Sequence, residues 1–327
     1  MRQFPIALLV VWTAACIAAY FYSHQQNIAP ALAAALLPAF LTELALYVAP
    51  GFQAVRRHFE RLGSKSVRAG LLTASAGIPY ALASVSFHGF HFPSLLLLVA
   101  LAGVASFWYA FLKRGPAADF FFLAFMAATF LSKVFLWIYA RPPGDPHLQL
   151  EILGHLMWVR LGIMAVLSIR GLENIRFGFV PARAEWKIGV QLYLFFLPVA
   201  GILAYVLNTP HFHPLPVVWW QYIARVAGTF LGMLWVVALG EEFFFRGFLQ
   251  QLASRGLRSE MGGLVVASAA FGMAHLPVRP FPNWRLAILA ATLGLFCGIA
   301  FVRARSVRAS MVTHALAATT VRLFFSP

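Results

Sequence analysis

The amino-acid sequence predicts an all-α protein, a transmembrane bundle of about eleven helices with its N-terminus inside. Hydrophobic residues make up 61% of the chain and charged residues only 11%, whereas a soluble domain carries about 25% charged residues. Apolar runs long enough to cross a bilayer recur along the whole chain. Lys and Arg gather in the short segments between these runs, as they do in membrane proteins.

The apolar runs give the expected helices in order. They lie near residues 4–22, 29–50, 69–87, 93–112, 118–140, 149–169, 188–207, 217–250, 262–275, 285–302 and 309–325. The first run follows Arg2 and could be a signal peptide, but no small-residue cleavage site precedes the second run, so we expect an uncleaved anchor. Cys16 and Cys297 lie in separate runs, and no disulfide framework is predicted.

The basic residues set the expected orientation. Segments 51–68, 113–117 and 170–187 are rich in Lys and Arg, whereas segments 23–28, 88–92 and 208–216 have none. Because basic loops stay on the cytoplasmic side, the N-terminus is expected inside and the C-terminus outside. The net charge of +15 is therefore read as a topology signal, and nucleic acid is not expected as a partner.

The chain is expected to divide near its middle. Residues 1–169 form an N-terminal transmembrane helical region of unassigned role, 170–190 an interfacial linker, and 191–327 a second helical region. Glu43 and Lys133 lie inside apolar runs of the first region, where ionisable side chains are costly unless paired. We expect a buried structural pair there, with Lys133 as the example partner of Glu43.

One stretch of the second region, Gly240 to Gln250, places two adjacent carboxylates at the end of an apolar run. Glu242 and Arg246 are four residues apart, so their side chains share a helix face. Glu241 is turned about 100° away and does not share that partner equally. We therefore expect Glu242 to be neutralised and Glu241 to be free to hold a proton or a water. The alternative is a purely structural ion pair.

Two histidines follow on separate helices. His275 ends the run 262–275, and His314 lies in the last run. Three helices could bring these histidines and Glu241 to one polar pocket, as sites in helical bundles are built. The sequence lacks H-E-x-x-H and G-x-S-x-G, so no metal or cofactor is predicted, and a zinc protease remains the nearest chemical alternative.

These residues resemble a known family. The patterns Glu241-Glu242-x-x-x-Arg246, Phe271-x-x-x-His275 and His314 are similar to the three signatures of the intramembrane glutamic proteases related to the type II CAAX prenyl endopeptidase, the CPBP or Abi group. The resemblance runs from about residue 177 to 325, so residues 191–327 are expected to be the protease core.

The resemblance implies a reaction and a role for each residue. Glu241 and His275 would activate a water, His314 would stabilise the oxyanion, and Arg246 would hold Glu242. The substrate would be a membrane-anchored or prenylated peptide, and the location a bacterial inner membrane. One position departs from the family, which has Asn or Asp where this chain has Ala318.

Because of that departure, a non-catalytic immunity or scaffold protein is the main alternative. A transporter is the third, suggested by Glu43, Lys133 and Glu151 within the first region.

Overall fold

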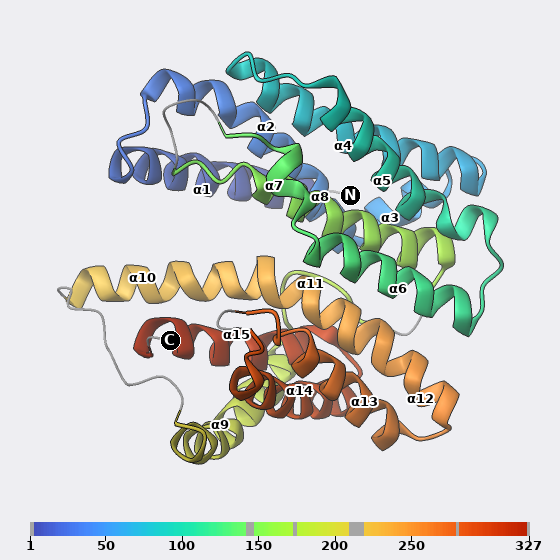
Figure 1. The fold of residues 1–327 in the computed structure, drawn as a ribbon, viewed down its shortest axis with the longest axis vertical. Coiled ribbons are helices and arrows are strands. Elements are labelled where there is room, and N and C mark those ends of the chain that lie inside the picture. The colour runs from blue at the N-terminus through green and yellow to red at the C-terminus, as the bar shows by residue number, and fades with distance from the viewer. Residues whose placement is uncertain (1–2, 142–146, 173–174, 209–218, 279–280, 326–327) are drawn as a thin grey trace. The chain divides into compact units, whose positions relative to one another are not determined.

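A computed structural model describes residues 3–141, 147–172, 175–208, 219–278 and 281–325. These residues are mostly helical, and no β-strand occurs among them. The chain forms two compact units, residues 1–173 and 174–327, which are described separately (Figure 1). The predicted all-α class is thus confirmed.

Unit 1 is built around helix α8. Its helices are α1 Gln3–Gln25, α2 Pro30–Val48, the 3₁₀ turn η1 Ala49–Gly51, α3 Gln53–Glu60, α4 Lys65–Ser86, α5 Phe92–Phe111, α6 Pro116–Leu131, α7 Val134–Ile138, α8 Glu151–Met164 and its π-helical continuation η2 Ala165–Arg170. Helices α2, α4, α5, α6 and α7 all contact α8. As a result, 78% of the most apolar stretch of α8 and η2 is buried inside the protein.

The predicted helix over 118–140 is interrupted in the structure. Lys133 adopts a left-handed conformation with φ of 56° between α6 and α7, a conformation that a side chain rarely favours and that ends a helix. The break leaves Lys133 exposed. The predicted pairing of Glu43 with Lys133 is therefore wrong.

Glu43 pairs with Arg160 of α8 instead. The two Oε atoms of Glu43 accept from Nε and Nη2 of Arg160 at 2.7 and 3.2 Å, and both side chains are buried. This bidentate geometry suits an arginine better than a lysine. The structural pair was expected, but its cation comes from a different helix.

Unit 2 contains one long helix and four shorter partners. Its elements are α9 Arg183–Val206, α10 Trp219–Gly232, the π-helix η3 Met233–Ala238, α11 Leu239–Glu242, the π-helix η4 Phe243–Gln250, α12 Gln251–Leu257, α13 Glu260–Met273, α14 Trp284–Ala304 and α15 Val307–Phe324. Residues 221–257 form one continuous span of 37 residues through α10 to α12.

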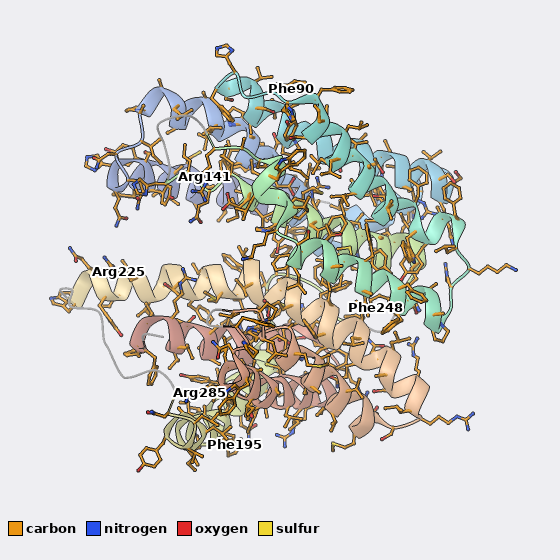
Figure 2. All side chains as sticks on the ribbon, in the orientation of Figure 1. Phe90, Arg141, Phe195, Arg225, Phe248 and Arg285 are labelled. Atoms are coloured by element: carbon orange, nitrogen blue, oxygen red, sulfur yellow. The ribbon has the colours of Figure 1, made fainter. Side chains whose placement is uncertain are left out.

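Eight helices of the described residues are long and apolar enough to cross a membrane: α1, α2 with η1, α4, α5, α8 with η2, α9, the α10–α12 helix and α14. Helices α6 and α13 are apolar but shorter. Outward side chains are often apolar, for example Phe195 on α9, whereas Phe248 is buried (Figure 2). This is a multi-pass integral membrane protein, with fewer full-length spans than the expected eleven runs.

Helices α9, α14 and α15 pack against one another. Leu192, Ala300 and Ala309 form their shared apolar cluster. At Gly189 the backbones of α9 and α15 approach closely, because an added Cβ would lie 2.6 Å from Val312 Cβ and 2.8 Å from the Ala309 carbonyl. Small residues allow such close helix contacts in membranes. This contact fixes the position of α15, the helix that carries His314.

Gly189→Val is therefore expected to destabilise unit 2 by about 1–3 kcal/mol, because the added methyl groups overpack the α9–α15 contact. Gly201→Ala on the same helix meets nothing within 4 Å and serves as the control. Thermal unfolding of both variants in detergent measures the difference. Equal midpoints for the two variants would contradict the close packing.

Candidate active site

The two glutamates lie on a short α-helical turn between two π-helical segments. Helix α11 spans only Leu239–Glu242 and is flanked by η3 and η4. Wide π-helical turns are rare and are frequently found at functional sites. The two carboxylates differ in their access to the outside: the Glu242 side chain is fully buried, whereas that of Glu241 is 36% exposed.

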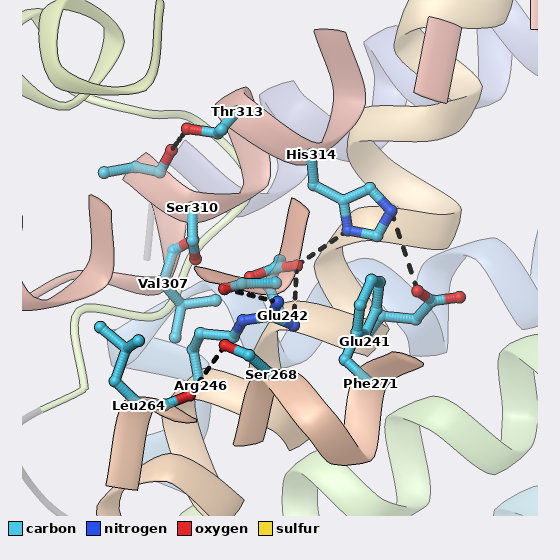
Figure 3. Close-up of polar contacts among 12 residues, drawn as sticks. Glu241, Glu242, Arg246, Leu264, Ser268, Phe271, Val307, Ser310, Thr313 and His314 are labelled. Carbon is cyan, nitrogen blue, oxygen red and sulfur yellow. Dashed lines mark hydrogen bonds and ion pairs between the residues drawn. The ribbon is translucent and has the colours of Figure 1, made fainter. Parts of the chain in front are cut away.

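The Glu242 carboxylate contacts a guanidinium on the same long helix and an imidazole on α15. Its Oε1 lies 3.2 Å from Nη1 of Arg246 and 2.8 Å from Nδ1 of His314 (Figure 3). Arg246 is also fully buried and donates through Nη2 to the Gly294 carbonyl at 3.2 Å. Glu242 thus joins the long helix to α15, and Arg246 joins it to α14.

Gly294 is needed for that last bond. A Cβ at this position would lie 3.0 Å from Ser268 Cα on α13 and 3.3 Å from Nη2 of Arg246. Any larger residue would push α14 away from α13 and from the guanidinium. The absence of a side chain therefore brings a backbone carbonyl to the buried arginine.

His314 lies between the two carboxylates. Its Nδ1 faces Glu242, and its Nε2 lies 3.8 Å from Oε2 of Glu241, beyond hydrogen-bond distance. Since an ionised carboxylate can only accept, Nδ1 is assigned as the donor to Glu242. The Nε2 atom then points toward the more exposed carboxylate.

Phe271 packs against three of the polar residues. Its ring centroid lies 4.5 Å from Cζ of Arg246, 4.8 Å from the His275 ring and 5.5 Å from the His314 ring. The guanidinium contact is a cation–π interaction, which is stronger in a desolvated site. Phe271 therefore forms an apolar wall shared by both histidines and the arginine.

The His275 ring is oriented by a backbone carbonyl at the end of α13. Its Nδ1 lies 2.8 Å from the Phe271 carbonyl, which can only accept, so Nδ1 is assigned as the protonated nitrogen. This leaves Nε2 as a base. His275 is linked to the rest of the cluster through Phe271, and the contacts of the described residues include no hydrogen bond from His275 to either glutamate.

The sequence identified most, but not all, of this cluster. Glu241, Glu242, Arg246 and His314 lie together, and the Glu242–Arg246 pair has the predicted spacing. The bond between His314 and Glu242 was not anticipated. Phe271 was seen only as part of a motif, and its i,i+4 spacing to His275 was the signal for its contact. The catalytic roles stay predictions.

The described residues contain no group of three His, Cys, Asp or Glu side chains placed to hold a metal ion. The imidazole Nδ1 atoms of His275 and His314 are both used in protein contacts. The carboxylate and imidazole atoms that point away from these contacts suit proton transfer to and from a bound water.

The fold and the site define a multi-pass helical membrane protein with a glutamate–arginine–histidine cluster inside its second unit. A family model described as "Type II CAAX prenyl endopeptidase Rce1-like" matches residues 223–320. Over that segment the chain is similar to this family, and the resemblance inferred from the motifs is confirmed. The segment includes all five predicted site residues. No curated protein and no solved structure matches the chain.

Proposed function

We propose that this protein is an intramembrane endopeptidase that uses Glu241 and His275 to activate water. The family match points to protease activity. The choice of Glu241 as the base rests on a difference in burial and contacts between the two adjacent glutamates. Glu242 is buried and contacts Arg246 and His314, whereas Glu241 is partly exposed, and its nearest ionisable contact among the described residues is His314 Nε2 at 3.8 Å.

In the proposed reaction, Glu241 takes a proton from a water as its oxygen attacks the scissile carbonyl carbon. His275 assists by accepting a hydrogen bond from the same water through Nε2. The carbonyl oxygen becomes an oxyanion, and the proton on Glu241 passes to the leaving amine nitrogen as the C–N bond breaks. Water and one peptide bond are thereby converted into a carboxylic acid and an amine.

His314 has the proposed role of donating to the oxyanion from Nε2. Because Nδ1 already donates to Glu242, this role requires a proton on both ring nitrogens. Glu242 is then a positioning residue: it orients the imidazole, and Arg246 balances its charge. Preorganised donors of this kind supply much of the rate in acyl-transfer enzymes.

The proposed substrate is a membrane-anchored or prenylated peptide. The family description names a CAAX prenyl endopeptidase, which favours a prenylated C-terminal segment. The membrane-spanning helices of both units fit a substrate that arrives through the lipid bilayer. We also propose a bacterial inner-membrane location, which fractionation of the native host tests directly.

The test is cleavage of a panel of prenylated, lipid-anchored and unmodified peptides by the full chain in detergent, with and without a chelator. We expect cleavage of at least one anchored peptide, and we expect it to survive the chelator. Chelator-sensitive cleavage would support the zinc alternative and contradict the glutamate mechanism.

Ala318 supports the alternative of a non-catalytic protein that keeps the fold. The position lies one turn after His314 on α15 and is partly exposed, so a side-chain amide there would share the histidine's face. The family has Asn or Asp here, and a missing oxyanion donor costs about 10²–10³ in rate.

Ala318→Asn is therefore expected to raise kcat by about tenfold or more, because the amide adds a donor beside His314. Ala318→Leu is the control, since it fills the same space without a donor. Initial rates on the best peptide of the panel decide the point. No gain from Asn over Leu would count against the oxyanion role of His314.

A further inference from the structure

A groove on the outer face of α5 in unit 1 has the features of a lipid site. Five residues of this helix and its C-cap Leu112 line a shallow hollow of about 430 Å³: Gly103, Val104, Phe107, Trp108, Phe111 and Leu112. Val104, Phe111 and Leu112 are exposed, at 47, 74 and 48%. All of the lining residues but the glycine are large and apolar, so the surface is suited to a hydrocarbon chain.

The groove has fixed walls. A side chain can be added at Gly103 without a clash, because its Cβ would make an ordinary van der Waals contact, 3.8 Å from Thr73 on α4. The Trp108 indole donates to the Ala118 carbonyl at 3.0 Å and stacks on Phe125 of α6. With a rise of about 1.5 Å per residue, the lining from 103 to 112 is about 14 Å long. One leaflet of the hydrocarbon core is about 15 Å deep.

A cluster of cations lies at one end of this groove. Helices α4 and α5 run antiparallel, since Gly70 is next to Phe107 and Gly103 is next to Thr73. The start of α4, with Lys65 and Arg68, therefore lies at the same end as Phe111 and Leu112. Lys65 and Arg68 are three residues apart on α4 and so share a helix face, and the charges of Arg68 and Arg114 both act on the Lys65 ammonium.

Two of these cations lie at the C-terminal end of η2. Arg68 donates from Nη1 to the Ser168 carbonyl at 3.0 Å. Nη2 of Arg114 would lie 3.4 Å from a Cβ at Gly171. Both guanidiniums thus cover the C-terminal end of η2, which favours positive charge. A guanidinium has five donor hydrogens, so donors remain for another acceptor.

The nearby carboxylate does not neutralise the cluster. Both oxygens of Asp119 are bound by Arg170 at 2.7 and 2.5 Å, and Tyr109 donates to the same group at 3.0 Å. Among the described residues, no ion pair joins a carboxylate to Lys65, Arg68 or Arg114. The sequence predicts that these loops lie on the cytoplasmic side.

We propose that unit 1 binds an anionic phospholipid, with its phosphate headgroup on Lys65, Arg68 and Arg114 and an acyl chain in the α5 groove. Basic pockets beside transmembrane helices on the cytoplasmic side recognise anionic headgroups in this way. Topology signals alone would explain the charges. They would not explain why cations from two segments meet beside an apolar groove one leaflet deep.

The test is a titration of delipidated full-length protein with phosphatidylglycerol or phosphatidylcholine of identical chains, followed by native mass spectrometry. Wild type is expected to retain phosphatidylglycerol preferentially. In the double variant Lys65→Gln/Arg114→Gln, retention is expected to weaken roughly 25-fold, since each basic residue near an anionic surface contributes a factor of about five. Arg255→Gln/Arg258→Gln in unit 2 removes the same charge at exposed positions and is the matched control.

A second variant keeps the charges and fills the groove. Gly103→Leu is expected to reduce retention of phosphatidylglycerol while leaving binding of inorganic phosphate unchanged, and it decides the matter if the double variant fails to fold. Brominated phosphatidylglycerol is expected to quench the fluorescence of Trp108, read as the difference from Trp108→Phe.

Four outcomes overturn the proposal. Equal retention of the two lipids, or an equal loss in the control, would reduce the cations to topology signals. Full displacement by inorganic phosphate without quenching at Trp108 would indicate a free-anion site. A change of oligomeric mass in Gly103→Leu would instead make the groove a contact between two copies of the chain.

Discussion

Glu241→Gln is expected to lower peptide cleavage by about 10²–10⁴-fold, the range that a positioned general base contributes. Gln has nearly the same shape as Glu but cannot accept the proton of the attacking water. The side chain is partly exposed, and its nearest ionisable partner, His314, is 3.8 Å away. The neutral variant therefore loses little native interaction, and its thermal midpoint is expected to stay close to that of the wild type.

The neighbouring position provides the matched control. Glu242→Gln makes the same chemical change one residue further along, but on a carboxylate that is fully buried against Arg246 and His314. It leaves a buried guanidinium without a charged partner, so it is expected to lower stability by several kcal/mol. Cleavage rates and unfolding midpoints measured side by side should separate the two variants. An active Glu241→Gln enzyme would falsify the assignment of the base.

The sequence predicts local features of this site because helical periodicity is a local property. Glu242 and Arg246 are one turn apart, and the structure pairs them at 3.2 Å. The same periodicity turns Glu241 away from this pair, and the structure shows the resulting difference in exposure. Hydropathy likewise located most of the helices, because an unpaired backbone is not tolerated in lipid, although the run 118–140 is broken at Lys133.

Contacts between distant helices could not be predicted in the same way. The bond from His314 to Glu242 joins residues 72 positions apart, and nothing in either helix specifies which carboxylate the imidazole meets. The partner of Glu43 illustrates the same limit. Lys133 and Arg160 both lie in apolar runs, and only the break at Lys133 and the central place of α8 select the arginine.

The π-helical turns could not be predicted from the sequence either. Segments η3 and η4 flank the glutamates, yet nothing in their sequences distinguishes a π-helix from an α-helix in an apolar run. A π-turn is stabilised by tertiary contacts that compensate its wider hydrogen-bond pattern. Here Trp235 of η3 donates to the Phe179 carbonyl at 2.9 Å, and Arg246 of η4 makes the contacts to Glu242 and Gly294.

Arg246→Met is expected to lower the free energy of unfolding by about 3–5 kcal/mol, because the buried Glu242 loses its arginine partner and keeps only the bond from His314. The arginine is fully buried and holds three different groups: the Glu242 carboxylate, the Gly294 carbonyl and the face of Phe271. Arg255→Met on the same long helix removes an exposed arginine and is expected to change stability by no more than about 0.5 kcal/mol.

A double variant separates charge from packing. Adding Glu242→Gln to Arg246→Met removes the stranded charge, so stability is expected to recover by about 1–3 kcal/mol relative to Arg246→Met. Activity is not expected to recover, because the neutral amide holds the His314 ring more weakly than the carboxylate does. Unfolding in detergent and cleavage rates give the two readouts. If the double variant is no more stable than Arg246→Met, the cost comes from lost packing around Phe271 rather than from the buried charge.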